Sequence, residues 1–345
     1  MLRTCESGEG LDIEIHEAVK FVKRQILGLS KGRVLSPLAA GMSLALLASG
    51  WTLSAEAAVF KLNDPNQEVV GRAFYVKSRK EDTLLDIGRQ NNMGYDDMRL
   101  ANQKVDIWVP KAGDDVLVPE SFVLPDAPHQ GIVLNLAEKR LYFYPSNGKE
   151  VATFAISVGR EGLNTPLGHF KVTSKVKDPT WTPTAAHHAD RAKEGREPLP
   201  AVVPAGPDNP LGEFALRTSA PSILIHGTNK PWGLGMEVSR GCIRMYPEGV
   251  SQLFPMVSVN EPITIVKQPY KFGWRGEDLY LEVHRDPEGT AASLHEVVPA
   301  RLAQSPEVNL DWNAVKRAVA ENTGLPQRVG GRQSAGNRLY LDMIF

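Results

Sequence analysis

The strongest constraint on the fold is a series of alternating apolar and polar residues that begins at Gly131. The segment GIVLNLAEKRLYFYP alternates around a predicted hairpin, and EVATFAISVG follows it from Glu150. Side chains of a strand point alternately to its two faces, so this pattern predicts half-buried β-strands. The 25 prolines and 30 glycines of the chain favour turns and strands over long helices. We therefore predict a mainly β domain over residues 128–267.

Residues 1–57 are typical of a leader with a signal peptide. Basic residues precede an apolar core at 34–53, and Ala55 and Ala57 have the small-residue spacing of a signal-peptidase site. We predict cleavage after Ala57 and export of the remainder. The alternative is an uncleaved membrane anchor, which the small residues at the end of the apolar core disfavour.

Charge argues against some classes of partner. The formal net charge of the 345-residue chain is -1. A nucleic-acid-binding protein or one that binds anionic membranes usually carries a strong basic patch, and no run of six like charges occurs here. We therefore predict no nucleic-acid partner.

The chain has two cysteines, Cys5 and Cys242. Removal of the leader would remove Cys5 and leave Cys242 alone in an exported protein, where cysteines are usually paired. A lone cysteine has three interpretations: a small buried apolar residue, a partner in an intermolecular disulfide, or a nucleophile. The surrounding sequence favours the third.

The sequence around Cys242 predicts that this cysteine lies next to a histidine. PSILIHGT predicts a buried strand that ends at His226, and CIRM predicts a second extended segment. Alternation puts Leu224 with His226 on one face, and Cys242 with Arg244 on one face. Glycine turns between the segments would fold the second onto the first. A thiol needs such a base or positive charge to become a thiolate, and the Gly241 N–H would help to form an oxyanion hole. A buried cysteine beside a core histidine stays the alternative.

This segment, IHGTNKPWGLGMEVSRGCIRM, closely resembles the catalytic segment of the L,D-transpeptidases, the ErfK/YbiS/YcfS/YnhG group with the YkuD domain. The family pattern HGT…S-x-G-C-[IV]-R-[LM] is matched by His226, Gly227, Thr228, Ser239, Gly241, Cys242, Ile243, Arg244 and Met245. Position 240 is often histidine in the family and is Arg240 here, which weakens any scheme that uses a second histidine. Upstream segments such as NTPLGHFKV also match, so the resemblance covers residues 73 to 285.

The resemblance implies a role for each matched residue. Cys242 would be the nucleophile and His226 the general base, oriented by a backbone carbonyl. The N–H groups of Gly241 and Cys242 would hold the oxyanion. The residues implied to bind substrate or shape its site are Ser239, Arg240, Arg244, Gly227 and Thr228. For Arg244 a structural ion pair is the alternative, and for Ser239 a hydrogen bond within a turn.

Two further regions flank the predicted catalytic domain. Residues 73–119 read as strand, helix, helix, strand and resemble a LysM module, which implies binding to the glycan of cell walls; a folded spacer without glycan binding is the alternative. Residues 268–345 predict a small mixed C-terminal accessory region with a helix near Trp312. The expected fold is thus a mainly β catalytic domain, YkuD-like as a β-sandwich or barrel, with a small βααβ LysM domain and a small mixed C-terminal domain.

The implied function is a periplasmic peptidoglycan L,D-transpeptidase. It would form an acyl-enzyme on a tetrapeptide stem with loss of D-Ala, then transfer the acyl group to a lipoprotein lysine or another stem's diaminopimelate. No cofactor and no metal is implied, and His187 with His188 lacks the partners of a zinc site. The insertion from Pro179 to Pro210 would cover the substrate. The alternatives are an L,D-carboxypeptidase or amidase of the same fold, and a non-enzymatic wall-binding protein.

Overall fold

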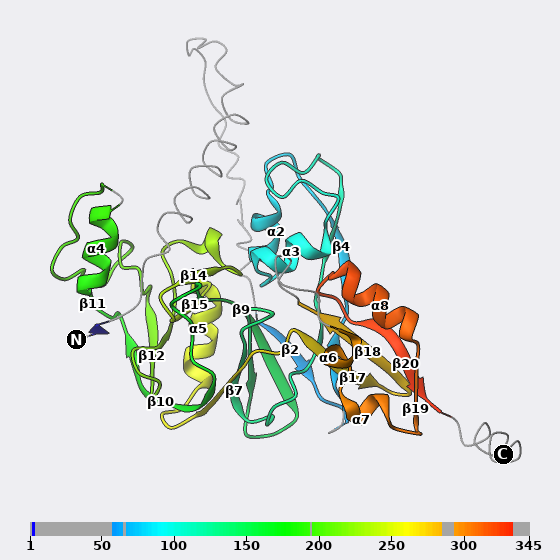
Figure 1. Cartoon of the computed structure of the whole chain (residues 1–345). Helices are drawn as coiled ribbons and strands as arrows, with labels where there is room; N and C mark the ends of the chain where they lie inside the picture. Colours follow the sequence, from blue (N-terminus) through cyan, green and yellow to red (C-terminus); the bar gives the residue numbers. More distant parts are fainter. Residues whose placement is uncertain (1, 4–56, 65–66, 194, 285–292, 334–345) are drawn as a thin grey trace, which may run out of the picture.

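The structure is a computed structural model that describes residues 2–3, 57–64, 67–193, 195–284 and 293–333. The predicted signal-peptide core at 34–53 lies outside the described residues. Within the described ranges, no helix is long and apolar enough to cross a membrane. A mainly β body lies at the centre of the molecule, with smaller helix-containing regions around it (Figure 1).

The central body is a closed sheet, which confirms the mainly β prediction. Its strands pair in the ring order β9-β15-β13-β12-β10-β16-β7-β8, and β8 pairs again with β9 to close the ring. The two strands β14 and β2 pair with β9 outside this ring. The strands are β2 (Ala58–Lys61), β7 (Gly131–Asn135), β8 (Arg140–Tyr144), β9 (Glu150–Gly159), β10 (Gly168–Lys177), β12 (Phe214–Thr218), β13 (Leu224–His226), β14 (Glu237–Ser239), β15 (Ile243–Met245) and β16 (Pro262–Val266).

The core of this barrel comes from the alternation that the sequence displays. Inward side chains such as Ile132, Leu141 and Phe154 are almost fully buried and form one apolar cluster. Helix α5 (Pro247–Met256) contributes Val250 and Leu253 to the same cluster and lies beside β12 (Figure 1). Burial of these side chains on both faces of the strands gives the barrel its rigidity and fixes the positions of the strand ends.

The N-terminal module, defined here as residues 69–123, has the predicted order of elements. It runs β3 (Val69–Gly71), β4 (Phe74–Lys77), α2 (Leu84–Gln90), α3 (Tyr95–Ala101), β5 (Asp115–Val118) and β6 (Ser121–Val123). β4 pairs with β5 antiparallel, and β3 with β6. Thr83 caps α2 in a capping box with Asp86, which satisfies backbone N–H groups at the first turn. The β-α-α-β arrangement of residues 73–119 is confirmed.

The module shares its hydrophobic core with the barrel. Met93 and Met98 pack in one cluster with Tyr142 and Val151 of the barrel strands. Below them, Arg140 on β8 donates to Asp97 on α3 at 2.7 Å, and their side chains are 1% and 7% exposed. A buried pair is costly to break because the remaining charge is then uncompensated. The two regions are therefore joined by both packing and charge.

Asn92 also joins the N-terminal module to the barrel, by hydrogen bonds to the backbone of β9. Its φ of 55° is in the left-handed region, which asparagine tolerates better than most residues. The side-chain amide donates to the Thr153 carbonyl at 2.7 Å and accepts from the Ala155 N–H at 3.1 Å. The loop between α2 and α3 is thereby bonded to a barrel strand as an additional strand would be.

The C-terminal region is a four-stranded sheet with helices packed on it. The sheet order is β17-β18-β20-β19, and the elements are β17 (Tyr270–Arg275), β18 (Asp278–Val283), α6 (Leu294–Val297), α7 (Ala300–Ala303), β19 (Val308–Leu310), α8 (Trp312–Glu321) and β20 (Gln327–Arg332). Asp311 caps α8 by accepting from the Asn313 and Ala314 N–H groups. Val315 lies in the core, whereas Trp312 is 39% exposed. The reason is that Ala314 and Ala318 fill the contact with the sheet instead.

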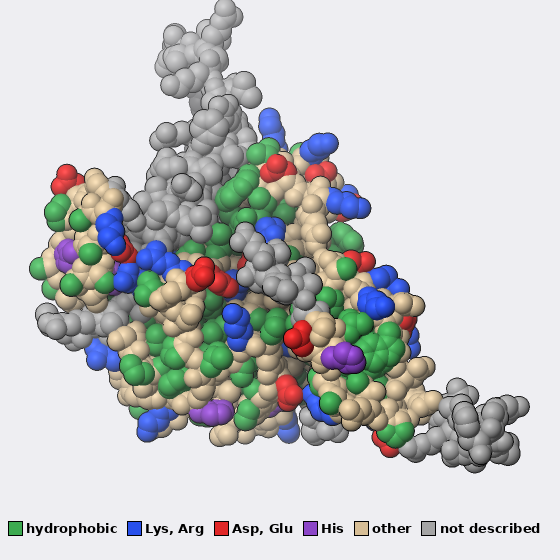
Figure 2. All heavy atoms as spheres, viewed as in Figure 1, with side chains coloured by type: hydrophobic (Ala, Val, Ile, Leu, Met, Phe, Trp, Pro, Cys, Tyr) green, Lys and Arg blue, Asp and Glu red, His purple; other side chains and the backbone are tan. Residues whose placement is uncertain are grey.

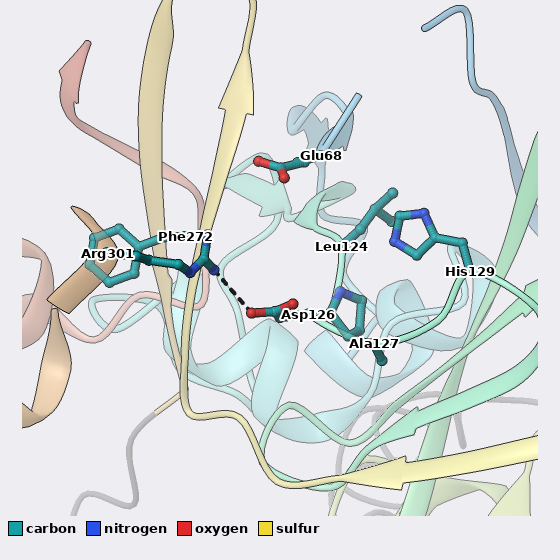
Figure 3. Close-up of a pocket in the computed structure, with 8 residues that line it drawn as sticks. Glu68, Leu124, Asp126, Ala127, His129, Phe272 and Arg301 are labelled. Carbon is teal, nitrogen blue, oxygen red and sulfur yellow. Dashed lines mark hydrogen bonds and ion pairs between the residues drawn. The ribbon is translucent and has the colours of Figure 1, made fainter. Parts of the chain in front are cut away.

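The segment that joins the module to the barrel is packed rather than a free linker. His129 stacks on Tyr144 with ring centroids 4.5 Å apart. A cavity of about 230 Å³ lies between this segment and the C-terminal region, and Asp126 pairs with Arg301 across it at 3.0 Å (Figure 3). Both of these charged side chains are exposed, so the pair adds little stability.

The insertion, defined here as residues 179–210, stands apart from the barrel body (Figure 1). It contains β11 (Trp181–Thr182) and α4 (Ala185–Lys193). β11 is bridged to Val203 and pairs in parallel with β1 (Leu2–Arg3). His187 is buried against Trp181, with an interplanar angle of 86°, and its Nδ1 contacts the Thr184 hydroxyl at 2.6 Å. His187 therefore packs the base of α4.

Candidate active site

The two predicted extended segments lie side by side. β13 pairs with β15 in parallel, with Ile225 opposite Ile243 and His226 opposite Arg244. Ile225 and Ile243 both point into the barrel core. Side chains alternate along each strand, so His226 and Arg244 lie on the other face, together with Leu224 and Cys242. The alternation thus gathers the predicted base and nucleophile on one side of the sheet.

His226 is held in one orientation by its own loop. The ring is fully buried, and its Nδ1 contacts the Gly227 carbonyl oxygen at 2.6 Å. A carbonyl only accepts, so Nδ1 carries the proton and Nε2 is the basic nitrogen. Among the described residues, Nε2 has no hydrogen-bond partner. Burial, with a smaller contribution from the positive charge of Arg244, lowers the pKa of His226 to about 3. The imidazole is therefore neutral at physiological pH.

Cys242 is fully buried in a small cluster between the barrel and the insertion. Its neighbours there include Trp181, Leu211 and Leu224. The Leu224 N–H donates to Sγ at 3.0 Å. Attack on a carbonyl requires the reduced sulfur of Cys242.

The turn before Cys242 is fixed by hydrogen bonds. Gly241 has a φ of 108°, a conformation that residues with a Cβ rarely adopt. Its N–H donates to Ser239 Oγ at 3.0 Å, and Ser239 Oγ donates to the Cys242 carbonyl at 2.6 Å. In this structure the Gly241 N–H is therefore bonded to Ser239, so it does not point to a free oxyanion position as expected. Ser239 itself forms the turn, which was its alternative interpretation.

Thr165 supports the turn and was not identified from the sequence. Its hydroxyl donates to the Gly241 carbonyl at 2.8 Å and accepts from the Gly159 N–H at 3.1 Å. A Cβ at position 159 would lie 2.3 Å from the Leu163 carbonyl oxygen, so only glycine fits there. The sequence did contain a signal for Thr165, because this residue belongs to the NTPLGHFKV segment that resembles the family.

The chain is similar to known proteins over most of its length. The family model of the L,D-transpeptidase catalytic domain matches residues 129–265. The chain is 36% identical over 291 residues to "Probable L,D-transpeptidase YbiS" of Escherichia coli strain K12, covering 81% of this chain and 94% of that protein. It is 34% identical to "Probable L,D-transpeptidase ErfK/SrfK" of the same strain, covering 80% of this chain and 93% of that protein.

The chain belongs to the L,D-transpeptidase family. Among solved structures it is similar to the catalytic domain of the Enterococcus faecium L,D-transpeptidase, with 22% identity and a TM-score of 0.31, over 41% of this chain and 99% of that chain.

Arg244 and the residues after His226 have structural contacts in this transpeptidase. Arg244 is 3% exposed and lies opposite His226 across the strand pair. A Cβ at Gly227 would lie 3.2 Å from a Val250 methyl group, so a small residue is required at this position. Thr228 accepts from the Lys230 N–H at 3.0 Å and lines a groove of about 440 Å³ with Arg89 of the N-terminal module.

Arg240 departs from the family's usual histidine and makes a contact that the sequence did not predict. It pairs with Asp190 on α4, which also pairs with Arg160 at 3.1 Å. Neither Asp190 nor Arg160 was a predicted site residue, because 50 and 30 positions separate the partners along the chain. The transpeptidase thus connects its insertion to the catalytic loop by charge.

Within the described residues, one buried group has side chains of metal-ligating type. Oxygen or nitrogen atoms of Glu138, Glu282 and His284 lie within 4.8 Å of one another. The Lys271 ammonium pairs with both carboxylates, at 3.1 Å from Glu282 Oε1. A lysine in this position supplies the positive charge that a metal ion would bring. The cluster ties the C-terminal region to the barrel of the transpeptidase and lies outside the strand pair that carries Cys242.

Proposed function

We propose that this protein is a peptidoglycan L,D-transpeptidase in which Cys242 is the nucleophile and His226 the general base. The observation that carries the proposal is the orientation of the histidine. Its Nδ1–H is fixed on the Gly227 carbonyl at 2.6 Å, which leaves a neutral, unbonded Nε2 on the strand face shared with Cys242. Base, orienting group and nucleophile are the three parts that covalent acyl transfer needs.

The reaction then follows in two steps. The reduced Cys242 sulfur attacks the carbonyl of the third residue of a tetrapeptide stem, and its proton passes to His226 Nε2. The terminal D-alanine leaves as the amine after taking this proton, and a thioester remains. An acceptor amine attacks the thioester, loses its proton to His226, and the sulfur regains it. One peptide bond is broken and one is formed, so the reaction needs no other source of free energy.

The low pKa of His226 bears on how the proton moves. A buried imidazole with a pKa of about 3 disfavours a preformed thiolate–imidazolium pair. We expect proton transfer to accompany the attack of sulfur on the carbonyl, once substrate fills the site. The oxyanion is assigned to backbone N–H groups of the turn at Gly241, which must first release Ser239 Oγ.

Partners and location complete the proposal. Residues 73–119 have the β-α-α-β order expected of a glycan-binding LysM module, and residues 1–57 have the composition of an export leader. We therefore place the enzyme in the periplasm, on the glycan and stem peptides of the wall. A lysine of an outer-membrane lipoprotein and the diaminopimelate of a second stem are the two candidate acceptors.

The decisive experiment supplies a tetrapeptide donor and an acceptor peptide that ends in lysine to the reduced protein. Mass spectrometry should detect the donor–acceptor conjugate and free D-alanine. Cys242→Ala should abolish both, and His226→Gln should slow acyl-enzyme formation by about a hundredfold or more, the usual contribution of a general base. His169→Gln is the matched control, because His169 lies on β10 and contacts Thr264 away from the site. Tripeptide alone, with acceptor in excess, would replace the transferase by the carboxypeptidase.

The pH profile of acyl-enzyme formation is a second test. The base form of His226 is present above its pKa, which burial lowers to about 3. Activity should therefore persist as pH falls through 6.5, the ordinary value for histidine. A drop centred near 6.5 would mean that the imidazole is solvated in the active enzyme.

A further inference from the structure

Three consecutive charged residues at the junction of β7 and β8 are buried. Glu138, Lys139 and Arg140 are 3%, 9% and 1% exposed. On the face of the molecule shown in Figure 2, by contrast, Lys and Arg side chains lie among Asp and Glu side chains at the surface. Charged side chains are almost never buried unless they are paired. Three such residues in a row therefore indicate a set of fixed partners.

The three side chains reach different parts of the molecule. Glu138 and Arg140 bind the C-terminal region and the N-terminal module, by the ion pairs described above. The Lys139 ammonium lies 3.0 Å from a carboxylate oxygen of Asp96 on α3 and 3.4 Å from one of Glu237 on β14. Of the three, Lys139 is thus the residue that connects the module to the strand before Cys242.

The backbone of Lys139 also leads directly to β14. The Ile156 N–H on β9 donates to the Lys139 carbonyl at 2.9 Å, and two residues further along β9 the Val158 N–H donates to the Met236 carbonyl at 3.2 Å. N–H groups two residues apart lie on the same edge of a strand. β14 therefore follows Lys139 along one edge of β9, which places Glu237 within reach of the lysine side chain.

β14 in turn determines the geometry of the turn that carries the nucleophile. It ends at Ser239, whose Oγ accepts from the Gly241 N–H at 3.0 Å and donates to the Cys242 carbonyl at 2.6 Å. The strand is three residues long, and its register against β9 is irregular between Glu237 and Ser239. Because so short and irregular a strand makes few ladder hydrogen bonds, a side-chain anchor contributes much of its position.

The charge and the backbone of Lys139 fit the role of an anchor. Burial acts to lower the pKa of its ammonium group, but Asp96 and Glu237 together outweigh burial and raise the pKa above the ordinary value for lysine. Lys139 is therefore charged at physiological pH. Its φ of 56° is in the left-handed region, which residues with a Cβ occupy when their surroundings require it.

We propose that Lys139 is a positioning residue for acyl transfer: its ammonium group holds Glu237, and β14 thereby fixes the turn from Ser239 to Cys242 relative to the N-terminal module. The inference rests on the proposed function, because this turn carries the proposed nucleophile and oxyanion donors. The partners of the ammonium group are carboxylates of the module and of β14, so Lys139 acts through the turn and not on the substrate.

The first test separates chemistry from binding. Lys139→Met removes the charge and keeps a long apolar side chain. We expect kcat for acyl-enzyme formation to fall about tenfold to a hundredfold, the effect of a misplaced reacting group, whereas KM for the tetrapeptide donor should change little. Lys139→Arg keeps the charge and should restore most of the rate. Arg328→Met, which removes the exposed pair with Asp278 in the C-terminal region, is the control and should leave both constants unchanged.

The second test does not depend on activity. Amide hydrogen exchange of Gly241, measured by NMR, reports the hydrogen bond to Ser239 Oγ, and it should be about tenfold faster in Lys139→Met while the amides of β8 stay as protected as in the wild type. Glu237→Ala should have the same effects as Lys139→Met, and the double variant should add no further loss, because both changes remove one contact. Glu237 is 52% exposed, so this variant tests the contact even if Lys139→Met does not fold.

The outcomes are distinct. Unchanged kcat and unchanged Gly241 exchange in Glu237→Ala would overturn the inference, as would a loss of rate in Lys139→Met that Lys139→Arg does not restore. Faster Gly241 exchange in the variants, with no acyl-enzyme in the wild type, would remove the transpeptidase function and leave the positioning contact. Acyl-enzyme formed equally fast by wild type and variants would keep the function and remove the role of Lys139.

Discussion

The N-terminal module and the insertion both contact the barrel near the candidate active site, but by different physical means. The module shares an apolar cluster with the barrel and adds the Arg140–Asp97 pair, whose side chains are 1% and 7% exposed. The insertion meets the catalytic loop through Asp190, whose pairs with Arg160 and Arg240 are partly exposed. Apolar burial cannot be exchanged for water at low cost, whereas a partly solvated ion pair can. We therefore expect the second contact to open more readily than the first.

The largest effect should come from Arg140→Ala. It leaves the buried Asp97 carboxylate without its guanidinium, which costs about 3–5 kcal/mol in the free energy of unfolding. Denaturant unfolding followed by fluorescence measures the change. Arg99→Ala is the matched control, because Arg99 pairs with Asp96 on the same helix at 3.1 Å but is 39% exposed. Equal losses in the two variants would show that the module is not joined to the barrel by the buried pair.

Gly235→Ala should come next. A Cβ at Gly235 would lie 2.3 Å from the Tyr95 N atom, and the residue has a φ of 87°. Backbone strain and the forced separation of two backbones together should cost about 3 kcal/mol and lower acyl-enzyme formation. Gly113→Ala has a similar φ of 90° with open space around it, so it reports the strain alone. If both variants lose the same stability, the contact between module and catalytic loop contributes nothing.

Asn92→Ala should cost about 2 kcal/mol, since two buried backbone groups of β9 lose their partners. Asn92→Gly loses the same hydrogen bonds but tolerates the φ of 55°. Thermal or denaturant unfolding should therefore rank Gly above Ala in stability. If both variants are as stable as the wild type, water must replace the hydrogen bonds of the asparagine amide between the module and β9.

The smallest effect on stability should come from Asp190→Asn. The partly exposed pairs of Asp190 contribute at most about 1 kcal/mol to the free energy of unfolding. Limited proteolysis should nevertheless cut the insertion faster in this variant, because α4 loses its contact with the catalytic loop. A loss of stability as large as that of Arg140→Ala would remove this difference between the two contacts.

The sequence predicted the elements better than the contacts between them. The long strand Glu150–Gly159 and the pairing of the segments at His226 and Cys242 both follow from alternation and turns. These are local rules that act over a few residues.

The contacts depend on residues far apart in the sequence. Arg140 meets Asp97 over 43 positions and Asn92 meets Thr153 over 61, and no periodicity marks such partners. Residues 73–119 therefore looked separable from the catalytic domain, whereas the two share a core. The Gly241 N–H could not be assigned from the sequence either, because its bond to Ser239 Oγ depends on the shape of one turn.

The Tyr95 N–H donates to the Leu234 carbonyl at 2.8 Å. This hydrogen bond joins the N-terminal module to the turn between His226 and Cys242. If the module binds glycan as proposed, binding there and binding at the active site would be thermodynamically linked through this turn. A glycan that binds the module more tightly in one arrangement of this turn changes the affinity of the active site for its peptide. By reciprocity the peptide changes the affinity for the glycan by the same factor. Such an enzyme would be allosteric within a single chain, with cell-wall glycan as effector.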